Sequence, residues 1–230
     1  MTSTIQDEFG NETIETRGGI PDRGMVITSY VMVPQIACML GLLVWVTPAV
    51  GAELEAQTWI HLAMRPHGRV AVAIGKYLVA FLWTASFAVG SSIFIGILSG
   101  VEDPFELTFA LAVISVLAAM SYAALYLLIG AVFYKRASIV AVIYSLALEG
   151  LVSFIPAAIN QASVSFRLRT LMSNWTSFRE GWEDNEYTAL IFGTEAPWLT
   201  IMILIGYSAT LLATACFVIR TREYPVQVEA

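Results

Sequence analysis

The chain has 230 residues, of which 57% are hydrophobic and only 13% are charged. Soluble domains carry about 25% charged residues, and the mean hydropathy here is +0.72. This composition excludes a soluble enzyme, a collagen-like fibre and a disordered chain. The net charge of −6 and the pI of about 4.9 argue against nucleic acid as a partner.

Residues 1–24 form a polar, acidic tail without the apolar stretch of roughly 7–15 residues that a cleavable signal peptide needs. We expect this tail to be external. A transmembrane domain over residues 25–220 and a cytoplasmic tail over residues 221–230 are expected to follow. Pro34 and Pro48 predict bends in the first spanning helix, which neighbouring helices can tolerate.

Long uncharged segments define the transmembrane domain. Four of them cover residues 24–52, 77–101, 107–134 and 196–219. Each exceeds the roughly 20 residues that a helix needs to cross a bilayer. Another apolar segment, about residues 138–159, contains one charge. The sequence therefore predicts an all-α, polytopic membrane helix bundle with five spanning helices.

The positions of Lys and Arg predict the orientation of the bundle, because cytoplasmic connections are rich in these residues. Seven cations would lie close to helix ends on the cytoplasmic side: Arg65, Arg69, Lys76, Lys135, Arg136, Arg220 and Arg222. Those on the opposite side lie in long segments that also carry most of the acids: Arg17, Arg23, Arg167, Arg169 and Arg179. We therefore expect the N-terminal tail outside and the C-terminus inside.

The connection after the first spanning segment has a helical period. Glu53, Gln57, His61 and Arg65 recur every four residues, while Trp59 and other apolar residues cover the opposite side. This pattern predicts an amphipathic helix that lies at the membrane surface. By periodicity alone, a passive anchor and a docking surface for a cytoplasmic partner are both open.

The sequence of this connection, AELEAQTWIHLAMRPHGRVAVAIGK at residues 52–76, resembles the signature loop of type-2 ABC transporter permeases. Gln57 stands where that family usually has glycine. The matching positions are Glu53, Glu55, Thr58, Leu62, Pro66, Arg69, Gly75 and Lys76. Residues 127–146 resemble the family's later glycine-then-basic turn, with Gly130, Lys135 and Arg136. The resemblance covers about residues 25–220.

The resemblance implies a multi-pass permease subunit of the cell membrane that binds no cofactor itself. Two copies of a cytoplasmic ATPase subunit, which would bind ATP and Mg, and a second permease copy or paralogue would complete an exporter. The amphipathic helix would couple the permease to the ATPase. Family members usually have six spans with this loop after the second. Here it follows the first, so a misassigned start, a truncated chain and a five-helix variant are alternatives.

Glu149 is the remaining candidate for function, because a charged side chain near the bilayer centre costs about 2.5–3.5 kcal/mol on insertion scales. Ser145 and Ser153 continue its face at helical spacing, so Glu149 is expected to face protein or water. It could line a substrate path together with these serines, or it could be a protonated or hydrogen-bonded packing residue. Both interpretations are open.

Other features give weaker signals. His61 and His67 have no nearby third ligand, so no metal site is predicted. An intramembrane enzyme that uses Glu149 with these histidines, and a structural or assembly membrane protein, are the alternative functions. Residues 163–180 are mildly amphipathic and could form external helices packed on the bundle or a structured loop. The row Ser92, Gly96 and Gly100 favours packing within the chain over a dimer motif.

Overall fold

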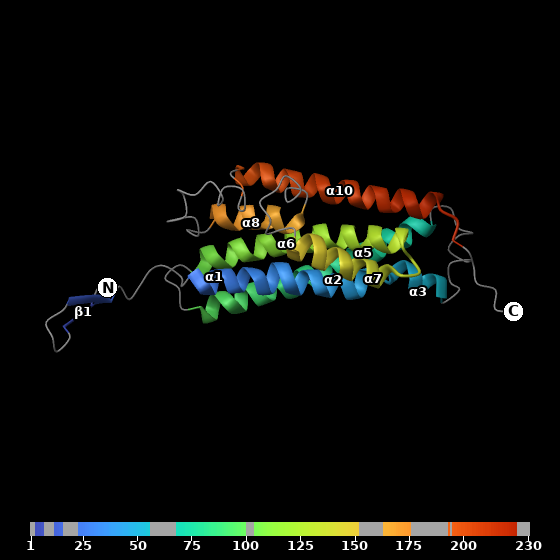
Figure 1. Cartoon of the computed structure of the whole chain (residues 1–230). Coiled ribbons are helices and arrows are strands. Elements are labelled where there is room, and N and C mark those ends of the chain that lie inside the picture. The colour runs from blue at the N-terminus through green and yellow to red at the C-terminus, as the bar shows by residue number, and fades with distance from the viewer. Residues whose placement is uncertain are drawn as a thin grey trace.

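The computed structural model describes residues 3–6, 12–15, 23–55, 68–99, 104–151, 163–175, 193 and 195–224. Within these ranges the chain is a bundle of helices with one small hairpin (Figure 1). In the hairpin, β1 (Ser3–Gln6) pairs antiparallel with β2 (Glu12–Glu15). All remaining described elements are helical, which agrees with the predicted membrane helix bundle.

The first spanning helix departs from regular α-helical geometry at both prolines. It consists of α1 (Arg23–Tyr30), the π-helix η1 (Val31–Ala37), α2 (Cys38–Val46) and α3 (Ala49–Glu55). Pro34 lies inside η1, where a wider turn accommodates a residue that lacks an N–H group. Pro48 lies in the short turn between α2 and α3.

The later elements follow the predicted order. They are α5 (Gly68–Leu98), α6 (Pro104–Val132), α7 (Ala137–Tyr144), the π-helix η2 (Ser145–Leu151), α8 (Val164–Trp175) and α10 (Pro197–Thr221). The start of α5 differs from the prediction, since the charge-free run places the second spanning helix from about residue 77. Helix formation does not require apolar side chains, so α5 extends through Arg69 into the predicted polar connection.

Among the described residues, four helices are long and apolar enough to cross a membrane: 27–55, 68–98, 104–132 and 197–221. They identify the chain as a membrane protein. Of the predicted fifth span, the structure describes α7 and η2, an apolar helix of shorter length. Residues 152–159 lie outside the described ranges, so the fifth span stays a prediction.

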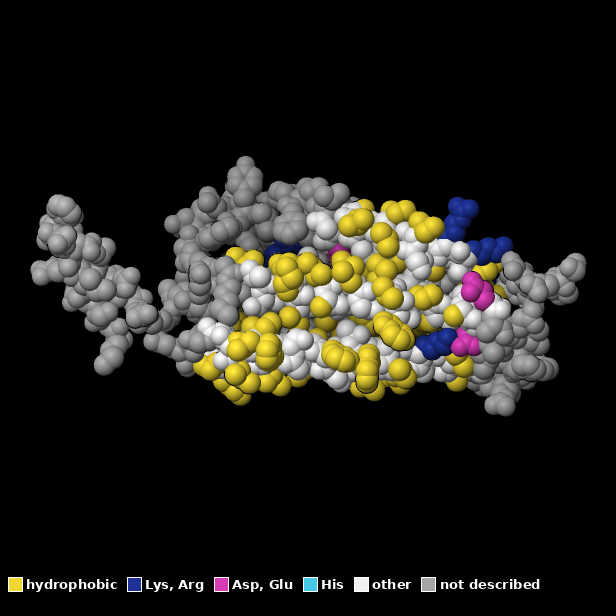
Figure 2. Space-filling model, turned by 90° about the horizontal axis from the view of Figure 1, so that it is seen from below, with side chains coloured by type: hydrophobic (Ala, Val, Ile, Leu, Met, Phe, Trp, Pro, Cys, Tyr) yellow, Lys and Arg dark blue, Asp and Glu magenta, His cyan; other side chains and the backbone are white. Residues whose placement is uncertain are grey.

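The bundle is built around α6. The helices α2, α5, α8 and α10 all contact it, and most of its side chains are buried. Ser92 of α5 is buried, and a side chain at Gly96 would collide with Thr108 of α6, so this pair packs within the chain. Large apolar side chains are exposed along the outer faces, as Figure 2 shows for one side of the molecule. A lipid environment explains such a surface.

Cations gather at the end of the bundle where α3, the α6–α7 turn and the end of α10 meet. Lys76 forms an ion pair with Glu53 there, and Arg222 lies over the ring of Tyr134. Figure 2 shows charged side chains at this end, beyond the apolar surface. We refer to it as the cation-rich end. It is the side that the Lys and Arg pattern predicts to be cytoplasmic.

Candidate functional site

The candidate residues fall into two groups, one around Glu149 and one at the cation-rich end. Glu149 lies in η2, and only 1% of it is exposed. Within the described part of the chain, η2 brings Glu149 next to the first turn of α8 and the middle of α6. A π-helix is uncommon and often occurs at functional positions, so the neighbours of Glu149 are of interest.

The carboxylate of Glu149 accepts hydrogen bonds from three helices. Its Oε2 atom accepts from Ser163 Oγ at 2.9 Å, the Ser165 backbone N–H at 2.8 Å and Tyr122 Oη at 3.1 Å. Its Oε1 atom accepts from the Val164 backbone N–H at 3.2 Å and Tyr144 Oη at 3.5 Å. All five partners can donate a hydrogen bond, and the two backbone N–H groups can only donate.

Two of these donors are backbone groups at the start of α8. The first N–H groups of a helix have no partner inside the helix and carry partial positive charge. Glu149 therefore caps α8 from a different helix, and it joins α8 to η2. This is a structural role that the contacts establish. The role of Glu149 in a substrate path stays a prediction.

Arg169 adds a charge to this group. It is buried on the inner side of α8. Burial lowers the pKa of Arg169, while its closeness to Tyr30 and Glu149 acts in the opposite direction. The guanidinium of Arg169 therefore places a positive charge near Glu149. This charge comes from α8, because η2 itself contains no Lys or Arg.

Of the two serines predicted to lie on the same face as Glu149, the structure describes only Ser145. Ser145 is buried, donates to the Ala141 carbonyl at 2.8 Å and pairs with Tyr126 Oη at 2.7 Å. Ser145 is thus one helical turn from Glu149 but bonds to other groups. Ser153 lies outside the described residues.

Sequence reasoning missed the tyrosines around Glu149. Tyr122 and Tyr126 lie four residues apart on α6, their rings stack with centroids 6.1 Å apart, and both are fully buried. The sequence did contain a signal: two tyrosines four residues apart in an apolar helix indicate a buried polar contact, because a buried hydroxyl needs a polar partner.

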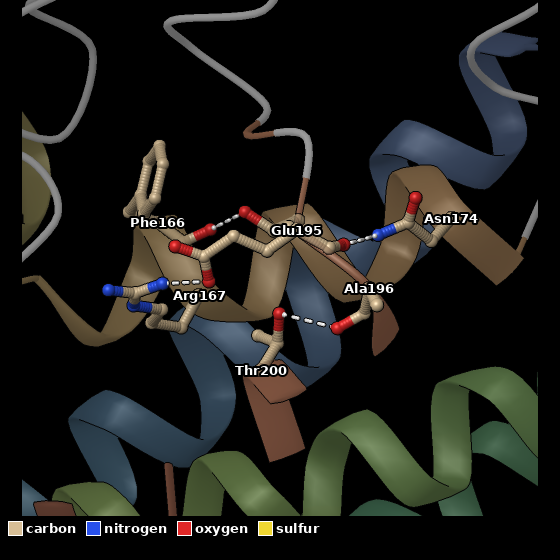
Figure 3. Close-up of polar contacts among 7 residues, drawn as sticks. Phe166, Arg167, Asn174, Glu195, Ala196 and Thr200 are labelled. Atoms are coloured by element: carbon tan, nitrogen blue, oxygen red, sulfur yellow. Dashed lines mark hydrogen bonds and ion pairs between the residues drawn. The ribbon is translucent and has the colours of Figure 1, made fainter. Parts of the chain in front are cut away.

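A second set of polar contacts fixes α8 from its other side (Figure 3). Arg167 of α8 forms an ion pair with Glu195, and Asn174 Nδ2 donates to the Glu195 carbonyl at 3.0 Å. Glu195 stands just before α10, so these contacts tie α8 to the start of that helix. The predicted amphipathic segment is therefore helical over the part that the structure describes, and it packs on the bundle.

The positions that carry the permease resemblance lie at the cation-rich end. Lys76 Nζ is 2.6 Å from Glu53 Oε1 and donates to the Ala49 carbonyl at 2.8 Å, so α5 is joined to α3. Glu55, at the end of α3, is exposed. Three further positions, Thr58, Leu62 and Pro66, lie outside the described residues. Arg69 and Gly75 lie on α5, and a Cβ at Gly75 would meet no atom within 4 Å.

The second stretch of the resemblance packs against the turn and helix start that lead into the first. A Cβ at Gly130 would lie 2.5 Å from the Thr47 carbonyl oxygen, so only glycine lets α6 approach the α2–α3 turn this closely. Gly51 lies against the Tyr134 carbonyl, which a Cβ would approach to 3.0 Å. The glycine-then-basic turn and the start of the signature loop therefore form one surface.

The residues after α10 complete this surface. Arg222 donates to the carbonyls of Val132 and Ala131, and Tyr224 Oη donates to the Ala131 carbonyl at 2.9 Å. These carbonyls belong to the last turn of α6, which has no helical partners for them. The cation-rich end is thus held by α3, α5, α6 and the segment after α10.

Metal ligands do not cluster in the described part of the chain, where no three His, Cys, Asp or Glu side chains are close enough to share an ion. His61 and His67 lie outside that part. The chain matches no protein-family model, no curated protein and no solved structure. Function is therefore argued from the two groups of residues alone.

Proposed function

We propose that the chain is the permease subunit of an ABC transporter of the cell membrane, which exports a substrate with ATP hydrolysed on a partner subunit. The observation that supports this proposal most is the ion pair between Glu53 and Lys76. These are the first acid and the closing lysine of the signature pattern, and they meet at 2.6 Å although the whole loop separates them in sequence.

The packing of the two resembling stretches supports the same proposal. Gly130 of the second stretch approaches the turn just before the first stretch at a distance that only glycine permits. Glu55 of the first stretch lines one groove with Lys135 and Arg136 of the second, so we infer that the two stretches move as one rigid unit. A rigid unit at the base of the spanning helices suits the transmission of movement from a docked ATPase. Two copies of that ATPase, with bound ATP and Mg, and a second permease copy or paralogue would complete the transporter.

Co-purification tests the proposal. The tagged full-length chain is isolated from its native membranes, and the proteins retained with it are identified by mass spectrometry and assayed for ATP hydrolysis. We expect a separately encoded ATPase in the eluate. Its absence from gently solubilised wild-type samples would contradict the proposal.

Matched charge reversals locate the contact. Glu55 and Glu106 are both exposed acids, at opposite ends of the bundle. We expect Glu55→Lys to lower ATPase recovery about tenfold, because repulsion at an interface costs more than one kcal/mol. Glu106→Lys should leave recovery unchanged. Equal recovery in both variants, at equal membrane insertion, would exclude docking at the signature loop.

A further inference from the structure

A groove at the cation-rich end has opposite charges on its two walls. Its volume is about 220 Å³, and it lies between α3 and the turn that leads into α7. One wall carries Glu55, and the other carries Lys135 and Arg136. The remaining lining residues are Pro48, Gly51, Ala52, Tyr134, Ala137, Ser138 and Ile139.

These charges do not neutralise one another. Within the described ranges, Glu55, Lys135 and Arg136 form no ion pair, although all three line the same groove. Lys135 lies over the ring of Tyr134, 5.9 Å from its centroid, which leaves its ammonium group at the surface. The groove therefore offers a carboxylate on one side and two cations on the other.

The groove continues into the lipid-facing surface. Ile139 lines it, and Ile143 lies one turn further along α7 on the same face; these side chains are 60% and 61% exposed. On the other side, Val44 lies one turn before Pro48 and is 65% exposed. Since α2 and α7 are in contact, these apolar side chains border one strip of surface that leads away from the groove.

We propose that this groove binds a phospholipid with a primary ammonium headgroup, of the phosphatidylethanolamine type, from the leaflet at the cation-rich end. Lys135 and Arg136 bind the phosphate, Glu55 binds the ammonium group, and the acyl chains lie along Ile139, Ile143 and Val44. Basic residues at a membrane surface attract lipid phosphate, and the carboxylate adds the preference for a headgroup that also carries positive charge. The site shares Glu55 with the proposed ATPase contact, but lipid binding is measured on the isolated chain and does not depend on the transport function.

Native mass spectrometry of the purified full-length chain in detergent tests the site. The chain is titrated with phosphatidylethanolamine, with phosphatidylcholine of the same acyl chains, and with phosphatidylglycerol. We expect phosphatidylethanolamine to bind most tightly, because the choline headgroup cannot donate a hydrogen bond to Glu55 and the glycerol headgroup has no ammonium group. Equal affinity for all three lipids would overturn the proposal.

Variants assign the binding to the groove. Arg136→Gln should weaken binding of phosphatidylethanolamine about tenfold, whereas Arg220→Gln, an exposed cation outside the groove, should have no effect. Glu55→Gln should abolish the preference over phosphatidylcholine while phosphatidylcholine still binds. Equal effects of Arg136→Gln and Arg220→Gln would show general charge attraction and overturn the site.

Two more measurements separate the groove from other sources of binding. Ala52→Trp fills the groove without a change of charge and should abolish the preference for phosphatidylethanolamine. Soluble glycerophosphoethanolamine, which has the headgroup without acyl chains, should bind far more weakly than the lipid. Unchanged binding to Ala52→Trp, or equal affinity for the soluble headgroup, would each contradict the proposal.

Discussion

At the scale of single residues, each oxygen of the Glu149 carboxylate accepts a hydrogen bond from a backbone N–H group, and this determines what a substitution should do. In Glu149→Gln, an NH₂ group replaces one carboxylate oxygen and faces donors in either orientation. We expect a loss of about 2 kcal/mol of stability, visible as a lower apparent Tm by tryptophan fluorescence. Tyr126→Phe, which removes a hydroxyl bonded to Ser145, should cost less. Equal Tm values for the two variants would contradict this account.

Substitutions of two helical glycines, Gly130 and Gly206, test the close packing of α6 against the α2–α3 turn. Gly130→Ala places a methyl group 2.5 Å from the Thr47 carbonyl oxygen, so α6 must shift, at a cost of about 1–3 kcal/mol. Gly206 has open space around it, and Gly206→Ala should stabilise α10 by up to about 1 kcal/mol. Thermal unfolding in detergent should therefore move in opposite directions. A similar shift for both would rule out close packing at Gly130.

The burial of Glu149 could be predicted from its sequence, because the residues around it are apolar. Its partners could not. Tyr122 lies on another helix, and Ser163 and Val164 follow an intervening segment, so only tertiary packing brings these groups to the carboxylate. The ion pair between Glu53 and Lys76 was not predicted either, because the sequence pattern names both positions without pairing them.

At the scale of elements, α8 depends on contacts at its side as well as at its first turn. Arg167 and Glu195 are partly buried, so their pairing should contribute about 1 kcal/mol. We expect this coupling energy from a double-mutant cycle with Arg167→Ala, Glu195→Ala and the pair, measured by thermal unfolding. Additive losses in the double variant would show that the ion pair contributes nothing.

The spanning helices were predictable where hydropathy determines them. The charge-free run 107–134 gave α6 within a few residues, and the run 196–219 gave α10 equally well. The start of α5 could not be predicted from hydropathy, because Arg69 and Lys76 are compatible with a helix but interrupt the apolar pattern. The two π-helices also escaped prediction, since their hydrogen-bond pattern has no simple period in the sequence.

At the scale of the whole molecule, the bundle has two chemically different ends. One contains Lys135, Arg136 and Arg222, and the other contains the first turn of α6. Because cations favour the cytoplasmic side, we expect Ser138→Cys to label only after permeabilisation and Phe105→Cys to label from outside, in a background without Cys38 and Cys216. The reverse pattern would invert the orientation.

The capping of α8 by Glu149 also has a consequence for the biogenesis of the protein. Ribosomes deliver the segment around Glu149 to the translocon before Ser163 and Val164 have been synthesised, so at that moment only Tyr122 and Tyr144 can bond to the carboxylate. We therefore expect residues 137–160 to insert poorly as an isolated segment in a glycosylation reporter, and Glu149→Leu to restore insertion. Efficient insertion of the unaltered segment would show that its insertion does not depend on α6, the helix that is synthesised before it.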